Sequence, residues 1–363
     1  MNILIDIGHP GHVHLFKNTA HQLESHGHRV FFSVRDIPIA KRLMDVYGMS
    51  YIDLGKKKDS ILGKAWAVIK QDVLLWWFVT KNKIDIGLSS GIALPHVSRF
   101  SRMKSIVFDD DDDEVEDLVV RYSHPYADTV LTPSCTREHR RTTNAVFYSG
   151  YHELAYLHPN VFSPDITVLS EIGLDENEKY FVLRFVALKG HHDIGQKGLS
   201  IEQKKRLVEI LSKYGRVIIT SERALEPEFE PFRLSVPAEY MHSVMSYATM
   251  YIGDSQTMTS EAAVLGIPAL RCNTFVGRIA YLEEEEKEYE LTYGFTPDRF
   301  NELLYKIEAL LQDPDLREKW EERRKALLKD KIDVSAFFTW FIENYPDSIQ
   351  VMRENPDYQW RFN

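Results

Sequence analysis

The chain has 363 residues, of which 44% are hydrophobic and 27% are charged, so it is long enough and apolar enough for two globular domains of ordinary size. Its formal net charge of -10 argues against general nucleic-acid binding, because the phosphate backbone favours Lys and Arg. The two cysteines, Cys135 and Cys272, stand far apart, which excludes a disulfide framework and gives no zinc-site spacing.

Apolar strands alternate with amphipathic helices through the first half of the chain. This alternation predicts a parallel sheet covered by helices on both faces. The expected strands are Ile3–Ile7, Arg29–Val34, Ile84–Leu88, Ser105–Phe108 and Thr129–Leu131, and the expected helices are Val13–Ser25, Ile39–Tyr47 and about Leu62–Lys81.

The same pattern restarts after residues 159–165, which have turn residues and no helical period and so suit a linker. We therefore predict an α/β protein with two Rossmann-like domains facing a cleft, the first over residues 1–160 and the second over 161–330. The expected strands of the second domain are Tyr180–Phe185, Arg216–Thr220 and Met250–Ile252, and its first helices are Ile201–Tyr214 and Tyr240–Tyr247.

Three further helices are expected at the end of the chain, over Phe300–Leu311, Pro314–Leu328 and Val334–Tyr345. The last is rich in aromatic residues and needs a large apolar surface, so we expect residues 331–363 to pack back onto the first domain. Two other conspicuous segments are interpreted as structural rather than functional. The Glu283–Glu286 run is expected to be a solvated helix face, and Trp76–Phe78 is expected to pack in the core.

The most informative segment is Gly253–Glu261, which follows a buried strand. Its small and hydroxylic residues predict a turn, with a helix beginning at Ser260. Unpaired N–H groups and the helix dipole make such a helix start an anion site, and the Glu261 carboxylate is placed to accept ribose hydroxyls. The alternative is an ordinary connection in which Ser and Thr only cap the helix.

Two other polar loops follow strands of the first domain, at the sheet edge where open α/β folds bind ligands. Gly8–His14 contains three histidines, which offer a general base near neutral pH; the alternative is that one caps the helix and one is exposed. Asp109–Glu116 carries a run of acids whose pKa values would rise if they crowd together in a cleft. Acids at a helix start can also simply stabilise its dipole.

These segments resemble known families. Gly253–Glu261 with Leu265–Pro268 closely resembles the nucleotide-binding segment of UDP-N-acetylglucosamine 2-epimerases and, more loosely, that of GT-B glycosyltransferases. Asp6–Phe16, Phe108–Asp110 and Gly150–Leu157 resemble the family catalogued as domain of unknown function 354. The similarity covers nearly the whole chain and implies a GT-B fold and a nucleotide-sugar substrate.

The resemblance also implies roles for residues of the signature segment. In the epimerases a serine and the two residues after it hold the pyrophosphate, and a glutamate six positions past that serine holds the ribose. The corresponding residues here are Ser255, Gln256, Thr257 and Glu261. The epimerases have two glycines where this chain has Gln256 and Thr257, so its backbone lacks the close approach that glycine permits.

Further cofactor-binding residues are implied at other strand ends of the second domain. Arg184 is the best candidate to neutralise the diphosphate through its planar guanidinium, followed by Lys189. Ser221 is expected to border the base or ribose, and Arg278 corresponds to an arginine that follows the signature in the epimerases. Each of these could instead be an exposed loop residue.

In the first domain the resemblance implies the catalytic residues. GT-B enzymes often place a histidine or an acid of the first loop toward the acceptor, which favours His9 or His12 as the base. The epimerases place an essential glutamate in the loop that corresponds to the acidic run, a place that Glu114 or Glu116 could fill. A His-x-x-His-x-His run also suits a metal, but a fourth ligand is missing nearby, so no metal site is predicted.

Three functions fit this reading. The first is a GT-B glycosyltransferase that transfers a sugar from a nucleotide diphosphate, with UDP as the expected nucleotide, in glycan or cell-surface polysaccharide synthesis. The second is a non-hydrolysing UDP-sugar 2-epimerase, and the third is a non-enzymatic nucleotide-sugar-binding protein. The epimerases place a His-Gly-Asp-like triplet after the fourth strand, where this chain has Ser89–His96 without an aspartate. We therefore rank the transferase first.

The expected partners follow from that ranking. They are a nucleotide-sugar donor and a glycan or lipid-linked acceptor, with no further cofactor and no nucleic acid. No apolar run approaches the ~20 residues needed to cross a bilayer, and the first residues lead directly into a strand, so we expect a cytoplasmic protein. Peripheral contact with the inner face of the membrane is the alternative. The sequence leaves the oligomeric state open.

Overall fold

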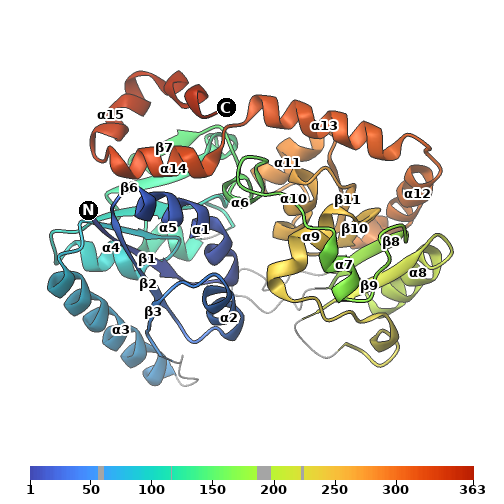
Figure 1. The fold of residues 1–363 in the computed structure, drawn as a ribbon, viewed down its shortest axis with the longest axis horizontal. Coiled ribbons are helices and arrows are strands. Elements are labelled where there is room, and N and C mark those ends of the chain that lie inside the picture. Colours follow the sequence, from blue (N-terminus) through green and yellow to red (C-terminus); the bar gives the residue numbers. More distant parts are fainter. Residues whose placement is uncertain (56–60, 116, 186–197, 222–224) are drawn as a thin grey trace. The chain divides into compact units, whose positions relative to one another are not determined.

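The computed structural model of the protein describes residues 1–55, 61–115, 117–185, 198–221 and 225–363. The chain forms two compact units: unit 1 comprises Met1–Val161 and Lys331–Asn363, and unit 2 comprises Phe162–Asp330. Each unit contains a parallel sheet with interleaved helices (Figure 1). The prediction of an α/β protein with two Rossmann-like domains is confirmed.

Unit 1 is built on a seven-stranded sheet in the order β3-β2-β1-β4-β5-β6-β7. Its strands are β1 (Asn2–Ile7), β2 (Arg29–Val34), β3 (Tyr51–Asp53), β4 (Ile86–Ser89), β5 (Lys104–Phe108), β6 (Thr129–Pro133) and β7 (Ala145–Tyr148). All neighbouring strands pair in parallel, so their carboxyl ends lie at one edge of the sheet. The central strands are apolar and buried, as expected of a sheet covered on both faces.

Helices connect these strands and supply the covering layers. They are α1 (Pro10–Ser25), α2 (Pro38–Val46), α3 (Ile61–Asn82), α4 (Ala93–Ser98), α5 (Asp117–Tyr122) and α6 (Leu154–Leu157), with a 3-10 turn η1 (Ser134–Thr136). Apolar side chains at helical spacing give α1 its buried face, which includes Val13, Phe16 and Leu23.

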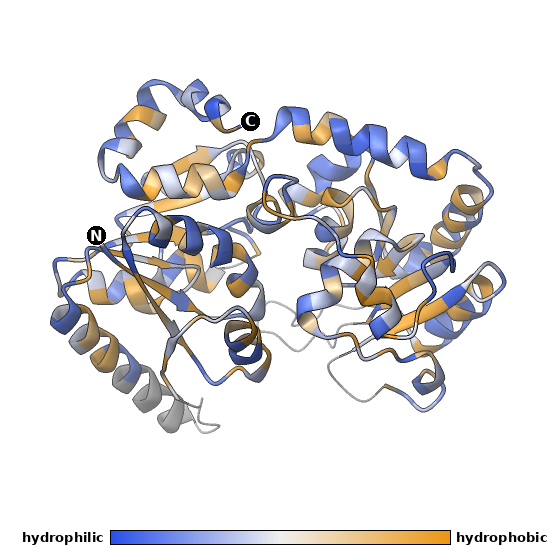
Figure 2. Cartoon of the chain, in the orientation of Figure 1, coloured by the Kyte–Doolittle hydropathy of each residue, from blue (hydrophilic) through white to orange (hydrophobic). Residues whose placement is uncertain are grey.

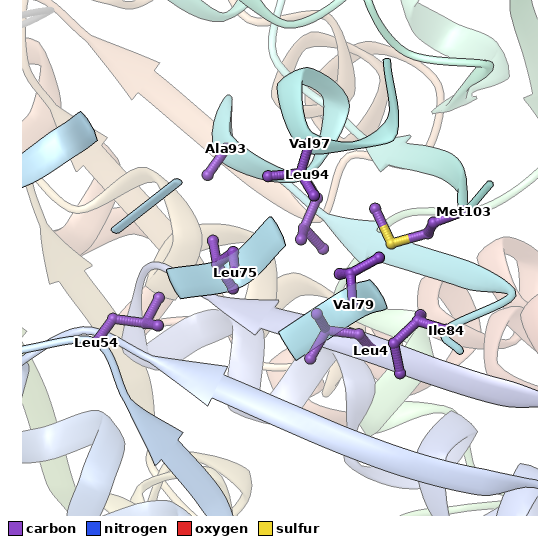
Figure 3. Packing of buried hydrophobic residues seen from close by; sticks show 9 residues of the cluster. All are labelled: Leu4, Leu54, Leu75, Val79, Ile84, Ala93, Leu94, Val97 and Met103. Atoms are coloured by element: carbon purple, nitrogen blue, oxygen red, sulfur yellow. The ribbon is translucent and has the colours of Figure 1, made fainter. Parts of the chain in front are cut away.

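A hydrophobic cluster joins β1, α3 and α4 (Figure 3). It consists of Leu4, Leu54, Leu75, Val79, Ile84, Ala93, Leu94, Val97 and Met103. Phe78 packs against this cluster, but Trp76 and Trp77 on the same helix are 43% and 51% exposed. The expectation that all three aromatic residues lie in the core is therefore wrong for the two tryptophans.

The end of the chain completes unit 1. Here α14 (Val334–Glu343) packs against α1, and it is followed by α15 (Asp347–Glu354) and the 3-10 helix η5 (Pro356–Phe362) (Figure 1). The ring of Phe338 meets those of Phe108 and Tyr148 edge-on, with centroids 4.8 and 5.2 Å away. The aromatic face of α14 thus lies on the apolar surface that the sequence requires for it.

Unit 2 contains a five-stranded parallel sheet in the order β12-β11-β10-β8-β9. Its strands are β8 (Tyr180–Arg184), β9 (Arg216–Thr220), β10 (Met250–Gly253), β11 (Ala269–Cys272) and β12 (Thr292–Phe295). The strands are apolar, whereas α13 is largely hydrophilic (Figure 2).

The helices of unit 2 are short, apart from three. They are α7 (Thr167–Glu171), α8 (Ile201–Leu211), α9 (Met241–Ser246), α10 (Gln256–Val264), α11 (Ala280–Lys287), α12 (Phe300–Leu311) and α13 (Leu316–Asp330), with 3-10 turns η2 (Glu230–Phe232), η3 (Ala238–Tyr240) and η4 (Pro297–Arg299). Within the described part of the chain, no helix combines the length and apolarity that a membrane span requires.

The glutamate run on α11 is not the solvated helix face that the sequence suggests. Glu285 is fully buried, and Glu283 and Glu286 form ion pairs with the buried Arg271 of β11, at 2.7 and 3.5 Å. A buried guanidinium attracts carboxylates that would otherwise face water, because an unpaired buried charge is costly.

Candidate active site

Polar residues gather at the carboxyl edge of the unit 1 sheet. Gly8–His12 follow β1, Arg35 follows β2, Asp109–Asp111 follow β5 and His152 follows β7. Because these strands are parallel, the four segments share the sheet edge at which open α/β folds bind ligands.

The two histidines predicted to be catalytic lie together at the end of β1. His9 is exposed and precedes α1, where its Nδ1 accepts a hydrogen bond from the Gly11 N–H at 3.1 Å. His12 lies in the first turn, and its Nδ1 accepts from the Gly8 N–H at 3.2 Å. The two ring centroids are 6.0 Å apart. His9 is therefore a helix cap, which is the alternative role that the sequence leaves open for one of the histidines.

The surroundings of His12 disfavour its cationic form. Burial lowers the pKa of His12 to about 3, reinforced by His9, His152 and Arg35 and opposed by Asp110. At neutral pH this imidazole is uncharged. The third histidine of the loop, His14, is instead buried on α1.

The acidic segment after β5 is organised by one buried arginine. Arg140 Nη1 lies 2.8 Å from Asp109 Oδ2 and 2.7 Å from Asp113 Oδ1, and its Nη2 donates to the carbonyl oxygens of Asp109 and Asp111. His124 Nε2 lies 2.8 Å from the same Asp109 oxygen. Arg140 thus holds the loop in place and pairs with two of its acids, Asp109 and Asp113.

This pairing reverses the pKa shift expected from crowding. Burial alone would raise the pKa of Asp109, but the His124 hydrogen bond and the Arg140 charge outweigh it and hold that pKa below its usual value. The rise in pKa expected from crowding therefore does not occur at Asp109, because a cation lies beside it.

Asp110, in contrast, lies beside a histidine. Its Oδ2 lies 3.1 Å from His152 Nδ1, and the His152 side chain is only 11% exposed. The other ring nitrogen, His152 Nε2, is buried and has no hydrogen-bond partner among the described residues. Neither Asp110 nor His152 is a predicted site residue, although both lie in segments that carry the family resemblance.

Glu114, one of the two glutamates predicted to be catalytic, does not lie in this cluster. Glu114 pairs with Arg141 at 3.1 Å, and each side chain is 73% exposed, so the pair belongs to the surface. Glu116 lies outside the described residues.

Three carboxylates at this sheet edge lie close enough together to be considered as ligands of a metal ion. Ligand oxygens of Asp109, Asp110 and Asp111 lie within 4.8 Å of one another. However, Asp109 already bonds to Arg140 and His124, and a second cation would have to share it with the guanidinium. The donor set therefore fits a metal poorly.

The signature segment of unit 2 forms a longer helix than predicted. Helix α10 begins at Gln256 rather than at Ser260, with Ser255 as its N-cap. The Ser255 Oγ accepts from the Met258 N–H at 3.4 Å, so the serine does cap the helix. As a result, Gln256 and Thr257 occupy the first turn, where backbone N–H groups remain for an anion.

Glu261 lies further along α10 and is buried. Its Oε1 is 3.0 Å from Nε2 of His242, a residue of α9 whose side chain is equally buried. His242 was not predicted as a site residue, since nothing in the sequence links the two helices. The contact fixes the orientation of the carboxylate.

The remaining predicted residues lie at other strand ends of unit 2. Arg184, partly buried at the end of β8, is paired in register with Gly253 of β10. Ser221 follows β9 and is partly buried. Arg278 is exposed, with its guanidinium 5.9 Å from the Phe275 ring centroid. Lys189 lies outside the described residues. The sheet thus brings Arg184 beside the signature segment.

Two parallel α/β units, each with polar loops at the carboxyl edge of its sheet, define a protein with two Rossmann-like domains of the GT-B type. The chain belongs to the family described as "Protein of unknown function (DUF354)", which matches residues 1–291. It is also similar to an uncharacterized protein of Methanocaldococcus jannaschii, with 22% identity over 303 residues that cover 79% of this chain and 86% of the relative.

Solved structures share the fold at low sequence identity. The S. aureus MnaA–UDP co-structure has a TM-score of 0.66 at 11% identity, covering 96% of this chain and 98% of that chain. The M. jannaschii UDP-GlcNAc 2-epimerase in complex with UDP-GlcNAc and UDP has a TM-score of 0.62 at 13% identity, covering 86% and 93%. A glycosyltransferase from Rickettsia africae has a TM-score of 0.61 at 11% identity, covering 94% and 97%.

Proposed function

We propose that the protein is a glycosyltransferase that uses a nucleotide-diphosphate sugar, with UDP as the nucleotide, in the synthesis of a glycan or cell-surface polysaccharide. The observation that carries the proposal is Glu261, a buried carboxylate oriented by His242 on a helix whose first turn follows a parallel strand. The UDP and UDP-GlcNAc in complex with the structural neighbours support the choice of nucleotide.

Unit 2 is the donor-binding unit in this proposal. The first-turn N–H groups of α10 and the Arg184 guanidinium would hold the diphosphate, because both favour oxyanions. The Glu261 carboxylate would accept hydrogen bonds from the ribose hydroxyls, since a carboxylate has several acceptor positions. The donor itself brings the leaving group, so no further cofactor is required.

Unit 1 supplies the groups for the acceptor. An uncharged imidazole and a histidine–aspartate contact lie at its sheet edge, whereas β4 ends at Ser89 and is followed by Ser90, without a carboxylate. A 2-epimerase must remove and return a proton at a sugar carbon, which calls for acid–base groups on both faces of the sugar. The epimerase therefore remains the alternative reaction for the same substrate.

The nucleotide assignment is tested by calorimetry with UDP. Glu261→Ala should weaken binding by about 1.5–3 kcal/mol for each charge-assisted hydrogen bond lost. Glu302→Ala, which removes an exposed glutamate from the same unit, is the matched control and should bind UDP normally. Unchanged affinity in Glu261→Ala would show that the nucleotide binds elsewhere.

The reaction is tested by incubation with a panel of UDP-sugars in deuterated water. A transferase without its acceptor should release UDP only slowly and incorporate no deuterium into the sugar. An epimerase should incorporate deuterium and yield a second isomer. Binding without either reaction, even when acceptors are supplied, would favour the non-enzymatic alternative.

Peripheral membrane contact, and with it a lipid-linked acceptor, has a specific observation in its favour. Trp76 and Trp77 are exposed on α3 near Phe100, and the Trp76 Nε1 donates to the Phe100 carbonyl. Lys81 Nζ lies 4.5 Å from the Trp77 ring centroid, and Trp with Lys is typical of membrane interfaces. Co-sedimentation with anionic vesicles should fall in Trp77→Ser and not in Trp360→Ser.

A further inference from the structure

Two histidines of unit 1 engage their ring nitrogens in opposite ways. In His152 it is Nδ1 that faces a carboxylate, at 3.1 Å from Asp110. A carboxylate only accepts, so the ring proton of neutral His152 resides on Nδ1. The lone pair is then on Nε2, which is buried and has no hydrogen-bond partner among the described residues.

In His12 the same reasoning leads to the other tautomer. The Gly8 N–H donates to Nδ1, so the Nδ1 lone pair is occupied and the proton of the neutral ring resides on Nε2. Burial is the main reason that His12 stays uncharged. His12 can therefore donate a hydrogen bond from Nε2, but it has no available lone pair with which to take up a proton.

We propose that His152, held by Asp110, is the general base of this site, and that His12 is a neutral hydrogen-bond donor beside it. The proposal rests on the proposed transferase function, and it replaces the first-loop histidines as the expected base. Asp110 acts through His152, so it is a positioning residue.

The chemical step balances without a further reactant. The acceptor hydroxyl gives its proton to His152 Nε2 while its oxygen forms the new bond to the anomeric carbon. The bond from that carbon to the diphosphate oxygen breaks, and its electron pair leaves with the diphosphate. The Asp110 carboxylate stabilises the imidazolium that results, and the Nε2–H of His12 donates to an oxygen of the bound acceptor or sugar.

The fold holds this pair in place from two sides. Arg140 and His124 take up Asp109, the residue next to Asp110, and fix the loop that carries both aspartates. On the other side, a Cβ at Gly150 would collide with Val334 of α14, so the β7 loop lies directly against that helix. A base oriented by fixed neighbours loses little entropy when it acts.

The protonation states can be measured on the full chain without any substrate. In two-dimensional NMR of the protein with 15N-labelled histidine, His152 should show the Nδ1–H tautomer and His12 the Nε2–H tautomer at pH 7. His124, whose Nε2 faces Asp109, is a matched internal reference and should show Nε2–H. Spectra of His152→Asn and His12→Asn assign the signals.

Asp110→Asn separates a positioning role from a merely structural one. The variant removes the carboxylate charge, so the His152 signals should shift while those of His124 stay unchanged. An Nε2–H tautomer for His152 in the wild type, or no response of His152 to Asp110→Asn, would overturn the assignment.

Turnover provides the second readout, measured as UDP release from a UDP-sugar with acceptors supplied. His152→Asn should lower it ~100-fold or more with unchanged UDP affinity, and His12→Asn should lower it less. His21→Asn changes an exposed histidine of α1 and should have no effect. Full turnover in His152→Asn would show that His152 is not the general base. If the wild type turns over no UDP-sugar, the proposed function fails, and the tautomers alone then decide the histidine–aspartate assignment.

Discussion

Two acidic runs, one after β5 in unit 1 and one on α11 in unit 2, are both paired differently from what their sequences suggest. Asp109–Glu114 looks like a functional cluster, and Glu283–Glu286 looks like a solvated helix face. In both, a single buried arginine from outside the run pairs with two acids: Arg140 binds Asp109 and Asp113, and Arg271 binds Glu283 and Glu286.

The two runs differ in how completely the arginine is satisfied. Arg140 bonds to side chains and to backbone carbonyls, and its acids are buried, whereas the acids around Arg271 remain partly exposed. Other acids of each run have other partners. Asp110 contacts His152, and Glu285 accepts from Ser260 Oγ at 2.5 Å. The comparison teaches that a buried cation outside an acidic run determines which of its acids are paired.

The largest effect is expected from Arg140→Met. Removing the guanidinium leaves Asp109 and Asp113 as unpaired buried charges and leaves two carbonyl groups without their hydrogen-bond donor. The free energy of unfolding should therefore fall by about 3–5 kcal/mol. Urea denaturation measures the change. A loss below about 1 kcal/mol would mean that the loop is held by other contacts.

Arg271→Met should cost less, about 1–3 kcal/mol, because Glu283 and Glu286 can turn toward water when their partner is gone. The same denaturation experiment applies. An equal loss of unfolding free energy in Arg271→Met and Arg140→Met would show that the two arginines stabilise their runs equally, which contradicts this expectation.

The pH dependences that Asp109 and Glu286 contribute to stability should have opposite signs. The pKa of Asp109 is lowered in the folded protein, so its contribution to stability is complete above about pH 4, the usual Asp value, and is lost as pH falls further. Burial raises the pKa of Glu286, so its ionisation destabilises the fold as pH rises above about 4.3.

Two neutral variants measure this contrast. Between pH 4 and 7, the stability of Glu286→Gln relative to the wild type should increase with pH. Asp109→Asn should be less stable than the wild type at pH 7, and the difference should shrink below pH 4. Parallel pH profiles for the two variants would contradict the opposite shifts.

The smallest effect is expected from Arg141→Ala. This residue adjoins Arg140, but its exposed contact with Glu114 should contribute under about 0.5 kcal/mol, because water solvates both groups and competes with the pair. Added salt should abolish even that difference. A loss near that of Arg140→Met would show that the loop depends on its surface charges as well.

The fold class could be predicted because parallel strands covered on both faces are continuous apolar segments, such as Ile3–Ile7. The three-residue β3 (Tyr51–Asp53) and the four-residue β7 (Ala145–Tyr148) escape such a search, since they are shorter than a readable period. The start of α10 was misplaced because hydroxylic residues favour turns and helix caps equally.

The site was only partly predictable, for a physical reason. Gly8–His12 was found because its residues are adjacent in sequence. Asp110 and His152 become partners only through the order of β5, β6 and β7, which no local pattern encodes. A usable signal did exist: Asp110 and His152 both stand in segments that already carried the family resemblance.

The return of residues 331–363 to unit 1 bears on how the chain is made. Synthesis proceeds from the N-terminus, so unit 1 has all its strands early but lacks α14, whose Phe338 covers Phe108 and Tyr148. All of unit 2 is translated in between, which takes roughly ten to thirty seconds at about 5–20 residues per second. During that time Phe108 and Tyr148 of the nascent first unit remain uncovered by α14, and chaperones can bind this aromatic surface. When residues up to 330 have left the ribosome, the nascent chain therefore presents a finished second unit and an unfinished first one.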